Sequence, residues 1–316
     1  MQQGYSDHEY RRAQRRHRRR RRRTARILFL LLIVVGELVA YKSGVDFLNL
    51  RLPTKASSKN IERSFETDLN ALSAQYSGEG GFAPSGSDMD ALRSTAKRNG
   101  SYREKIEFFI EHIGWYDQTA VNTVLLSPEK IDFVLMCPFA ENTTTRDWGI
   151  SVKKGEVPYF IQYDSRWAFH SYGSSCMGNT GCGPTCLAMA AAGLTGNGSY
   201  TPDAVADYAY NAGYYVPGSG TSWELFTSGA KHFGVEGRQI SAGKSEMESC
   251  LASGDVLIAS LLPGDFTMAG HFIVIYGTQL GGFRVYDPSS VARSGVVWSF
   301  ARLEPQIAQL WSLSAD

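Results

Sequence analysis

Gly181-Cys182-Gly183-Pro184-Thr185, followed at once by the apolar run Cys186-Leu187-Ala188-Met189-Ala190, is the stretch that decides the fold. Proline is favoured in the first turn of a helix, where its missing N–H costs nothing, so the run predicts a helix over residues 184–192. Cys182 then lies at or just before the helix N-terminus, where the dipole favours a thiolate. Cys182 is therefore the candidate nucleophile; the alternative is a tight turn with a buried, inert cysteine.

A candidate base for this cysteine opens another apolar stretch. His271 begins a predicted strand, and Asp287 comes 16 residues later. A hairpin loop over residues 278–282, centred near Gln279, places His271 opposite or diagonal to Asp287 on one face of the sheet. Asp287 would then accept the imidazole N–H and set its tautomer. A core histidine and a turn-forming aspartate explain each residue alone, but their register together with the Gly-Cys-Gly-Pro motif favours a catalytic triad.

Helices come first and strands follow around these residues, an order that predicts an α+β domain with an antiparallel sheet. Residues 157–163 predict an entry strand. Further helices are predicted over residues 202–210, 222–233 and 246–253, and strands over residues 256–262, 271–278, 283–286 and 296–300. The candidate nucleophile therefore belongs to the helical part of the domain, and the candidate base to the sheet.

Four segments carry a family resemblance when they are taken together. They are Val-Pro-Tyr-Phe-Ile-Gln-Tyr-Asp-Ser-Arg-Trp (157–167), Gly-Cys-Gly-Pro-Thr-Cys-Leu-Ala-Met (181–189), Gly-His-Phe-Ile-Val (270–274) and Tyr-Asp-Pro (286–288). The set resembles the double-glycine-leader family of papain-like cysteine peptidases, in particular its stand-alone bacterial members. The resemblance implies a papain-like fold and peptide-bond hydrolysis by Cys182, His271 and Asp287. It also implies that Gln162 donates to the oxyanion; the alternative for Gln162 is a polar side chain at a strand edge.

The first 41 residues predict a membrane anchor. Residues 1–26 contain 11 Arg residues and precede the apolar segment 27–41, whose flanking Arg26 and Lys42 can snorkel outward. The segment is short of the ~20 apolar residues usually needed to span a bilayer, but a positive block before it favours export of the chain after it. We therefore predict a basic cytoplasmic tail, a single-pass cell-membrane anchor and an extracytoplasmic catalytic domain. The alternative is secretion after cleavage of a signal peptide.

Three further parts are predicted after the anchor: a stalk or linker over residues 42–100, a helical prelude over residues 101–141 and the cysteine peptidase domain over residues 157–316. The Ser- and Gly-rich segment 77–87 is typical of a flexible linker. In the prelude, apolar residues recur at helical spacing from Ile106 to Ile113. The apolar face that they form must be buried, and the catalytic domain is its expected partner.

Charge and cysteine content argue against several other classes of function. The chain carries a net charge of +1, but residues 27–316 alone carry −8, which argues against nucleic-acid binding. The five cysteines are too few for a disulfide scaffold and do not have the spacing of zinc ligands. We therefore predict no metal or other cofactor. The predicted partners are a peptide or protein substrate and, through the anchor, the membrane.

Two other functions remain open. A cell-wall cysteine amidase or endopeptidase uses the same nucleophile and base, but it usually completes the triad with a further polar residue, often histidine, rather than with Asp-Pro. A non-catalytic peptide-binding module on the same fold usually lacks a triad residue, whereas all candidates are present here. Digestion of purified peptidoglycan tests the first alternative, and a thiol-reactive probe directed at Cys182 tests the second.

Overall fold

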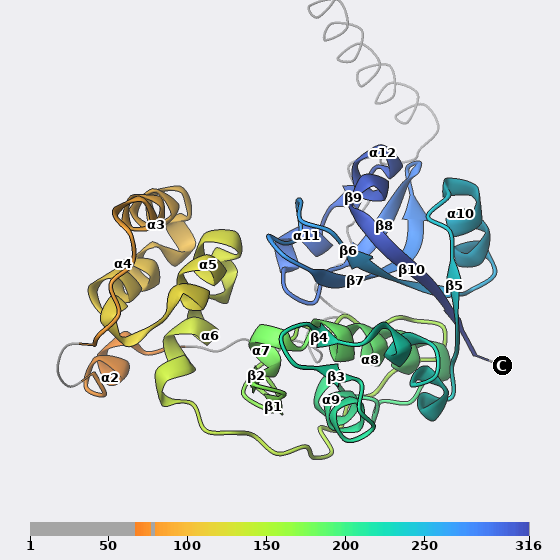
Figure 1. Ribbon diagram of the computed structural model, residues 1–316, viewed down its shortest axis with the longest axis horizontal. Coiled ribbons are helices and arrows are strands. Elements are labelled where there is room, and N and C mark those ends of the chain that lie inside the picture. Colours follow the sequence, from red (N-terminus) through yellow and green to blue (C-terminus); the bar gives the residue numbers. More distant parts are fainter. Residues whose placement is uncertain (1–66, 77–79, 316) are drawn as a thin grey trace, which may run out of the picture. The chain divides into compact units, whose positions relative to one another are not determined.

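The computed structural model describes residues 67–76 and 80–315 (Figure 1). The predicted basic tail 1–26 and anchor 27–41 lie outside these residues. Within the described ranges, no helix has both the length and the apolar character needed to cross a bilayer, which takes about 20 consecutive apolar residues. For the part of the chain that the structure describes, this finding contradicts the predicted single-pass localisation in the cell membrane.

A six-stranded antiparallel sheet forms the later part of the described chain (Figure 1). In the order of the sheet, its strands are β5 (Glu236–Ile240), β10 (Ile307–Ser314), β6 (Val256–Leu261), β7 (His271–Gln279), β8 (Gly282–Tyr286) and β9 (Val297–Trp298). Together with the helices, this sheet confirms the α+β class. The sequence patterns did not indicate β5 or β10; in β5 the burial is concentrated at Ile240, so it lacks the alternation of a half-buried strand.

Helices cover both faces of the sheet. Side chains of β6 and β7 alternate between two cores, so that Ile258 and Val274 face one core, whereas Leu257 and Ile273 face the other. Helix α8 (Cys182–Thr195) packs in the first core and α10 (Lys244–Ala252) in the second. The strands at the centre of the sheet are therefore buried on both sides, which explains their continuous apolar sequence.

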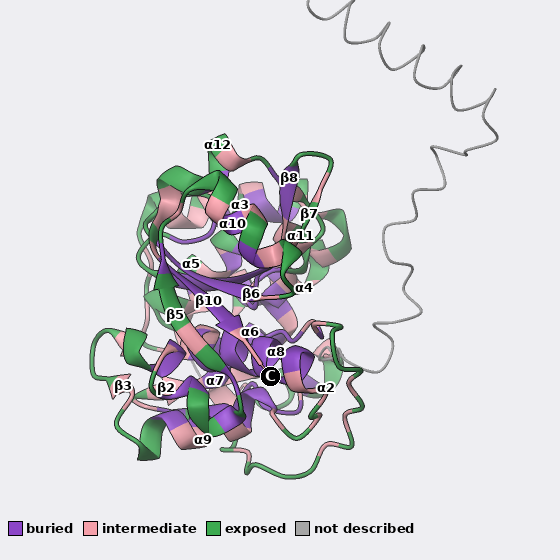
Figure 2. Ribbon diagram, turned by 90° about the vertical axis from the view of Figure 1, so that its right-hand side faces the viewer, coloured by how far each residue is buried: buried purple, intermediate pink, exposed green. Residues whose placement is uncertain are grey.

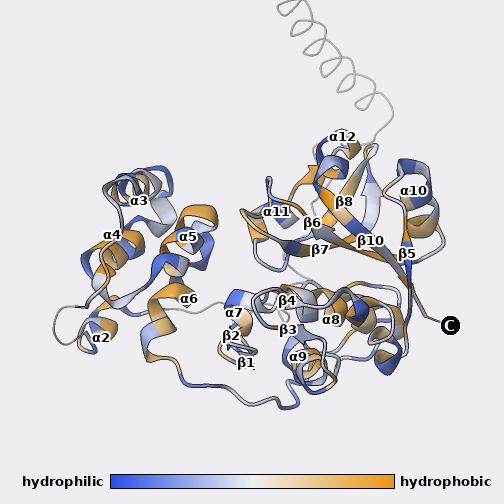
Figure 3. Cartoon of the chain, in the orientation of Figure 1, coloured by the Kyte–Doolittle hydropathy of each residue, from blue (hydrophilic) through white to orange (hydrophobic). Residues whose placement is uncertain are grey.

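Helix α8 is enclosed along nearly its whole length. Every residue from Gly183 to Leu194 is buried, as the purple ribbon in Figure 2 shows. Figure 3 shows the same helix as largely hydrophobic, and a helix that is apolar all round is stable only when it is surrounded by protein. It ends at Gly196, whose φ of 79° is the left-handed conformation of a helix C-cap. Cys182 is thus fixed at the end of a rigid element.

Two predicted elements differ from the structure. Residues 157–163 form irregular backbone instead of an entry strand, because Pro158 lacks a donor and the Gln162 N–H bonds to the Pro288 carbonyl rather than to a ladder. The predicted helix over residues 222–233 is two short 3-10 helices, η6 (Trp223–Phe226) and η7 (Ala230–Phe233). Between them, Thr227 has φ −119° and ψ −84°, which breaks the helix.

The prelude is a cluster of short helices with its own core. It contains α2 (Leu69–Ser73), α3 (Gly86–Arg98), α4 (Arg103–Glu111), α5 (Gln118–Leu126), the 3-10 helix η4 (Pro128–Lys130) and α6 (Ile131–Met136). Helix α3 lies within the segment 42–100 for which a stalk was predicted, and it buries Leu92 and Ala96 against α4 and α5. The same core includes Ile161 and Tyr163, which precede α8. The prelude and the peptidase region therefore share buried surface.

Further short helices and two separate two-stranded sheets, β1–β2 and β3–β4, complete the peptidase region. They are β1 (Ser171–Tyr172), β2 (Ser175–Cys176), α7 (Met177–Thr180), α9 (Pro202–Asn211), β3 (Tyr215–Val216), β4 (Gly220–Thr221), α11 (Val291–Ser294) and α12 (Phe300–Leu303). Helix α9 packs on α8, and α11 packs on β8. Two of these short elements, α7 and α11, flank the candidate site.

Candidate active site

Cys182 is the first residue of α8, with Gly181 as its N-cap. The groups that act on its thiol are the side chain of His271 and the backbone N–H groups of Phe272 and Gly183. Gly183 approaches Thr221 so closely that an added Cβ would lie 2.5 Å from the Thr221 Oγ1 atom. The start of the helix therefore requires the glycine that follows the cysteine.

The environment of Cys182 favours its thiolate. Burial by itself raises the pKa of the Cys182 thiol, but the hydrogen bond and positive charge of His271, with the N–H groups of Phe272 and Gly183, outweigh burial and lower the pKa. In contrast, burial raises the pKa of Cys186, one turn further along α8, well above its ordinary value. The pKa values of the two thiols of this helix are therefore shifted in opposite directions, and Cys182 is the one whose thiolate is favoured.

His271 and Asp287 are joined by a hairpin whose turn differs from the predicted one. The turn residues are Leu280 and Gly281, both at positive φ (50° and 75°), as a two-residue hairpin of type I′ requires. The loop is therefore not centred near Gln279. Val274 pairs with Tyr286, and continuing this register past Tyr286 places Asp287 diagonal to His271 rather than opposite to it.

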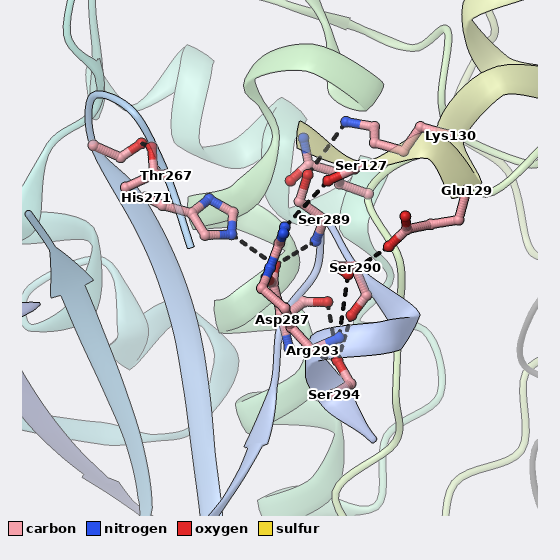
Figure 4. A network of polar contacts seen from close by, with 12 residues as sticks. Ser127, Glu129, Lys130, Thr267, His271, Asp287, Ser289, Ser290, Arg293 and Ser294 are labelled. Carbon is pink, nitrogen blue, oxygen red and sulfur yellow. Dashed lines mark hydrogen bonds and ion pairs between the residues drawn. The ribbon is translucent and has the colours of Figure 1, made fainter. Parts of the chain in front are cut away.

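This diagonal arrangement brings the two side chains into direct contact. The Nε2 atom of His271 lies 2.7 Å from the Oδ1 atom of Asp287, and both side chains are buried (Figure 4). Burial lowers the pKa of His271, but the charge and hydrogen bond of Asp287, with a contribution from Cys182, raise it to about 9. Because Nε2 is engaged with Asp287, Nδ1 is the ring nitrogen that remains for Cys182.

Three residues that follow Asp287 also form hydrogen bonds with it. Its Oδ1 atom accepts the backbone N–H of Ser289 at 2.7 Å, and its Oδ2 atom accepts the guanidinium Nε–H of Arg293. The Asp287 N–H donates to the hydroxyl of Ser294 at 2.8 Å. Burial raises the pKa of Asp287, but His271 and Arg293 outweigh it and lower the pKa. The carboxylate is therefore ionised and fixed in direction.

Gln162 lies beside this site and contacts its supporting backbone. Its backbone N–H donates to the Pro288 carbonyl at 2.8 Å, and its side-chain Nε2 donates to the Gly178 carbonyl at 2.9 Å. The Gln162 side chain is buried, and its Oε1 atom has no hydrogen-bond partner among the described residues. These hydrogen bonds tie Gln162 to the loop of Asp287 and to α7, rather than to Cys182 or His271 directly.

Sequence reasoning missed the residues that support Asp287. Arg293, Ser289 and Ser294 follow Asp287 within seven residues, but Ser-Ser-Val-Ala-Arg-Ser has the composition of an ordinary surface turn. Their role depends on the chain turning back on itself through α11, which the sequence pattern did not indicate. Among the described residues, no group of three or more His, Cys, Asp or Glu side chains is placed to hold a metal ion.

Comparison with known protein families agrees with this geometry. The model of the Peptidase_C39 like family matches residues 154–313, half of the chain. The chain belongs to this peptidase family. It is therefore a cysteine-type peptidase, in agreement with the family resemblance of its sequence motifs. No curated protein matches the chain.

Solved structures of related peptidases are similar to part of this C39-like peptidase. The peptidase domain of Streptococcus ComA, a bi-functional ABC transporter involved in a quorum-sensing pathway, is 22% identical, with 43% of this chain and 93% of that chain covered and a TM-score of 0.34. A provisionally assigned C39-like peptidase from Bacillus anthracis is 16% identical, with 53% of this chain and 98% of that chain covered, also at a TM-score of 0.34.

Proposed function

We propose that this C39-like peptidase hydrolyses peptide bonds in a peptide or protein substrate by a papain-like mechanism. In this proposal Cys182 is the nucleophile, His271 is the acid–base residue and Asp287 orients and stabilises the imidazolium. Two observations carry the proposal: the 2.7 Å contact between the His271 Nε2 and Asp287 Oδ1 atoms, and the lowering of the Cys182 pKa by the neighbouring His271. A nucleophile, a base and an orienting group in this order are the requirement for an activated thiolate.

The chemical steps follow from the positions of these groups. The Cys182 thiolate attacks the carbonyl carbon of the scissile bond, and the carbonyl oxygen takes the negative charge. The His271 imidazolium then donates its Nδ1 proton to the leaving amine as the C–N bond breaks, which leaves an acyl-enzyme. Neutral His271 next takes a proton from a water molecule, and the resulting hydroxide attacks the thioester carbonyl. The C–S bond then breaks, which releases the acid product and regenerates the Cys182 thiolate. Asp287 keeps its position throughout.

The developing oxyanion needs donors close to Cys182. The backbone N–H of Cys182 is one of the first in α8, where N–H groups have no intrahelical acceptor. In our proposal the second donor is Gln162, because one hydrogen of its Nε2 group binds Gly178 and the other remains for the substrate oxygen. A pre-oriented donor of this kind typically contributes about 10²- to 10³-fold to kcat.

An active-site probe and a peptide library together test the proposed function. We expect an electrophilic thiol probe at mildly acidic pH to label Cys182 and not Cys186, because only the first thiol has a lowered pKa. The labelled protein should lose its hydrolysis of the peptide library in proportion to labelling. Release of products from purified peptidoglycan without any peptide cleavage would instead assign the site to the amidase class.

The pH dependence of kcat/KM should be bell-shaped. The thiolate forms as pH rises through the lowered pKa of Cys182, so the acid limb should lie below the ordinary thiol value of about 8.5. The imidazolium needed by the leaving amine is present below the raised pKa of His271 and is lost as pH rises through about 9. Initial rates measured across this range check both limbs, and activity that first appears near the ordinary thiol pKa would rule out His271 as the partner of Cys182.

A further inference from the structure

A lysine of the prelude reaches the support of the candidate site. Lys130 ends the 3-10 helix η4, and its side chain is buried, with the residue 4% exposed. Its Nζ atom donates to the Gly178 carbonyl at 3.0 Å and to the Ser289 hydroxyl at 3.3 Å (Figure 4). It also lies over the ring of Tyr163, 5.2 Å from the centroid. An ammonium group is costly to bury, so such a position calls for a specific role.

Lys130 and Gln162 form hydrogen bonds with the same two segments of the chain. The Gly178 carbonyl accepts both the Lys130 ammonium and the Gln162 side-chain amide. Ser289 directly follows Pro288, whose carbonyl accepts the backbone N–H of Gln162. Lys130 therefore bridges α7 and the Asp287 loop, the same two segments that fix the backbone and the side chain of Gln162.

Neighbouring residues of the prelude dock on the same loop. The hydroxyl of Ser290 donates to the carboxylate of Glu129, and the guanidinium of Arg293 donates to the Ser127 hydroxyl at 3.3 Å. The segment 127–130 thus contacts the Asp287 loop at three points, and Figure 4 shows Ser127, Glu129 and Lys130 beside that loop. This contact supports a prelude that holds the site in place, rather than one that obstructs it.

Building on the proposed function, we propose that Lys130 is a positioning residue for the oxyanion-stabilising amide of Gln162. A carbonyl accepts hydrogen bonds only from the nitrogen side of an amide, so the Gly178 oxygen decides which way the Gln162 amide faces. Lys130 fixes that oxygen and, through Ser289, the loop that carries Pro288. Without the ammonium, the Gly178 carbonyl and the loop of Ser289 lose their shared donor, and the Gln162 amide that depends on them shifts away from the oxyanion.

Lys130→Met in the full chain tests this role, because methionine keeps an unbranched side chain of similar length without a donor. We expect kcat for peptide hydrolysis to fall about 10- to 100-fold, with KM changed little. The upper figure equals the smallest loss of kcat that removal of an oxyanion donor typically causes. Alkylation of Cys182 by chloroacetamide forms no oxyanion, so its rate should stay within about twofold. The matched control is Lys105→Met, because Lys105 pairs with Asp132 at 2.6 Å inside the prelude; this variant should keep full activity.

The double variant with Gln162→Ala decides the route of the effect. If Lys130 acts through Gln162, Lys130→Met should add little to the loss already caused by Gln162→Ala. Full additivity, an unchanged kcat, or an equal fall in kcat and in the alkylation rate would overturn the inference. Failure of the proposed function has a different signature, since Cys182→Ala would then retain hydrolysis. Unfolding of the Lys130→Met protein would appear as loss of selective Cys182 labelling. Because kcat and the alkylation rate would then fall together, this outcome would also overturn the inference.

Discussion

Cys182→Ala should abolish peptide hydrolysis, with a loss of kcat on the order of 10⁶-fold, because the variant has no nucleophile to form the acyl-enzyme. The substitution removes one sulfur atom at the end of α8 and leaves the buried residues 183–194 unchanged. We therefore expect the thermal unfolding midpoint to stay close to that of the unaltered protein. Rates with an optimised peptide substrate, together with a thermal melt, measure both quantities.

Cys186→Ala is the matched control for this experiment. Cys186 lies on the same helix and is fully buried, and burial raises the pKa of its thiol. Its loss should change stability modestly and leave thiol-probe labelling and hydrolysis in place. The reverse pattern, in which Cys182→Ala is active and Cys186→Ala is inactive, would assign the nucleophile to the other cysteine.

His271→Ala should cost nearly as much activity as removal of the thiol, on the order of 10⁵- to 10⁶-fold in kcat, because groups that act as a unit fail together. His271 lowers the pKa of Cys182, and in the proposed mechanism it also donates the proton to the leaving amine. The rate of thiol alkylation at mildly acidic pH should fall in parallel, since the thiolate loses its counter-charge. His232→Ala serves as the control, because the His232 ring stacks on Tyr208, 4.0 Å between centroids, away from Cys182.

Asp287→Asn should be milder, at least about tenfold less severe than His271→Ala. The asparagine oxygen can still accept from His271 and from the Ser289 N–H, so the imidazole keeps its direction. The amide nitrogen then faces the Arg293 guanidinium, and two donors in contact destabilise the loop. A comparison of kcat/KM and unfolding temperature for both variants separates the two effects. An Asp287→Asn enzyme with unaltered kcat/KM would reduce Asp287 to a turn residue.

The parts of the fold that the sequence predicted are those with a strong local pattern. The apolar run behind Cys182 predicted a helix over residues 184–192, inside the observed α8, and the apolar strands of the hairpin predicted β7 and β8. The segment 157–163 was wrongly predicted as a strand because its apolar residues are buried without forming strand hydrogen bonds. Pro158 argued against a strand, since proline cannot donate a backbone hydrogen bond. The strand β5 escaped detection because its place in the sheet comes from pairing with β10, about 70 residues away along the chain.

In the candidate site, too, the residues that the sequence predicted belong to local motifs, and those that it missed depend on distant contacts. Cys182 stands in a local helix-start motif, and a hairpin explains the spacing of His271 and Asp287, so the amino-acid sequence is enough to select all three as candidates. Lys130 could not be selected in this way, because its partner Ser289 is 159 residues away and the lysine lies in an ordinary helix start. Contacts of this length leave no periodic signal in a single sequence, and only the folded chain reveals them.

The position of β10 means that the six-stranded sheet can close only after this strand has been synthesised. This strand lies between β5 and β6 and is the element that joins them into one sheet. A chain synthesised only as far as β9 would have two unpaired strand edges and an incomplete floor beneath α8. The backing of α8 is therefore complete only after segments about 70 residues apart along the chain have paired.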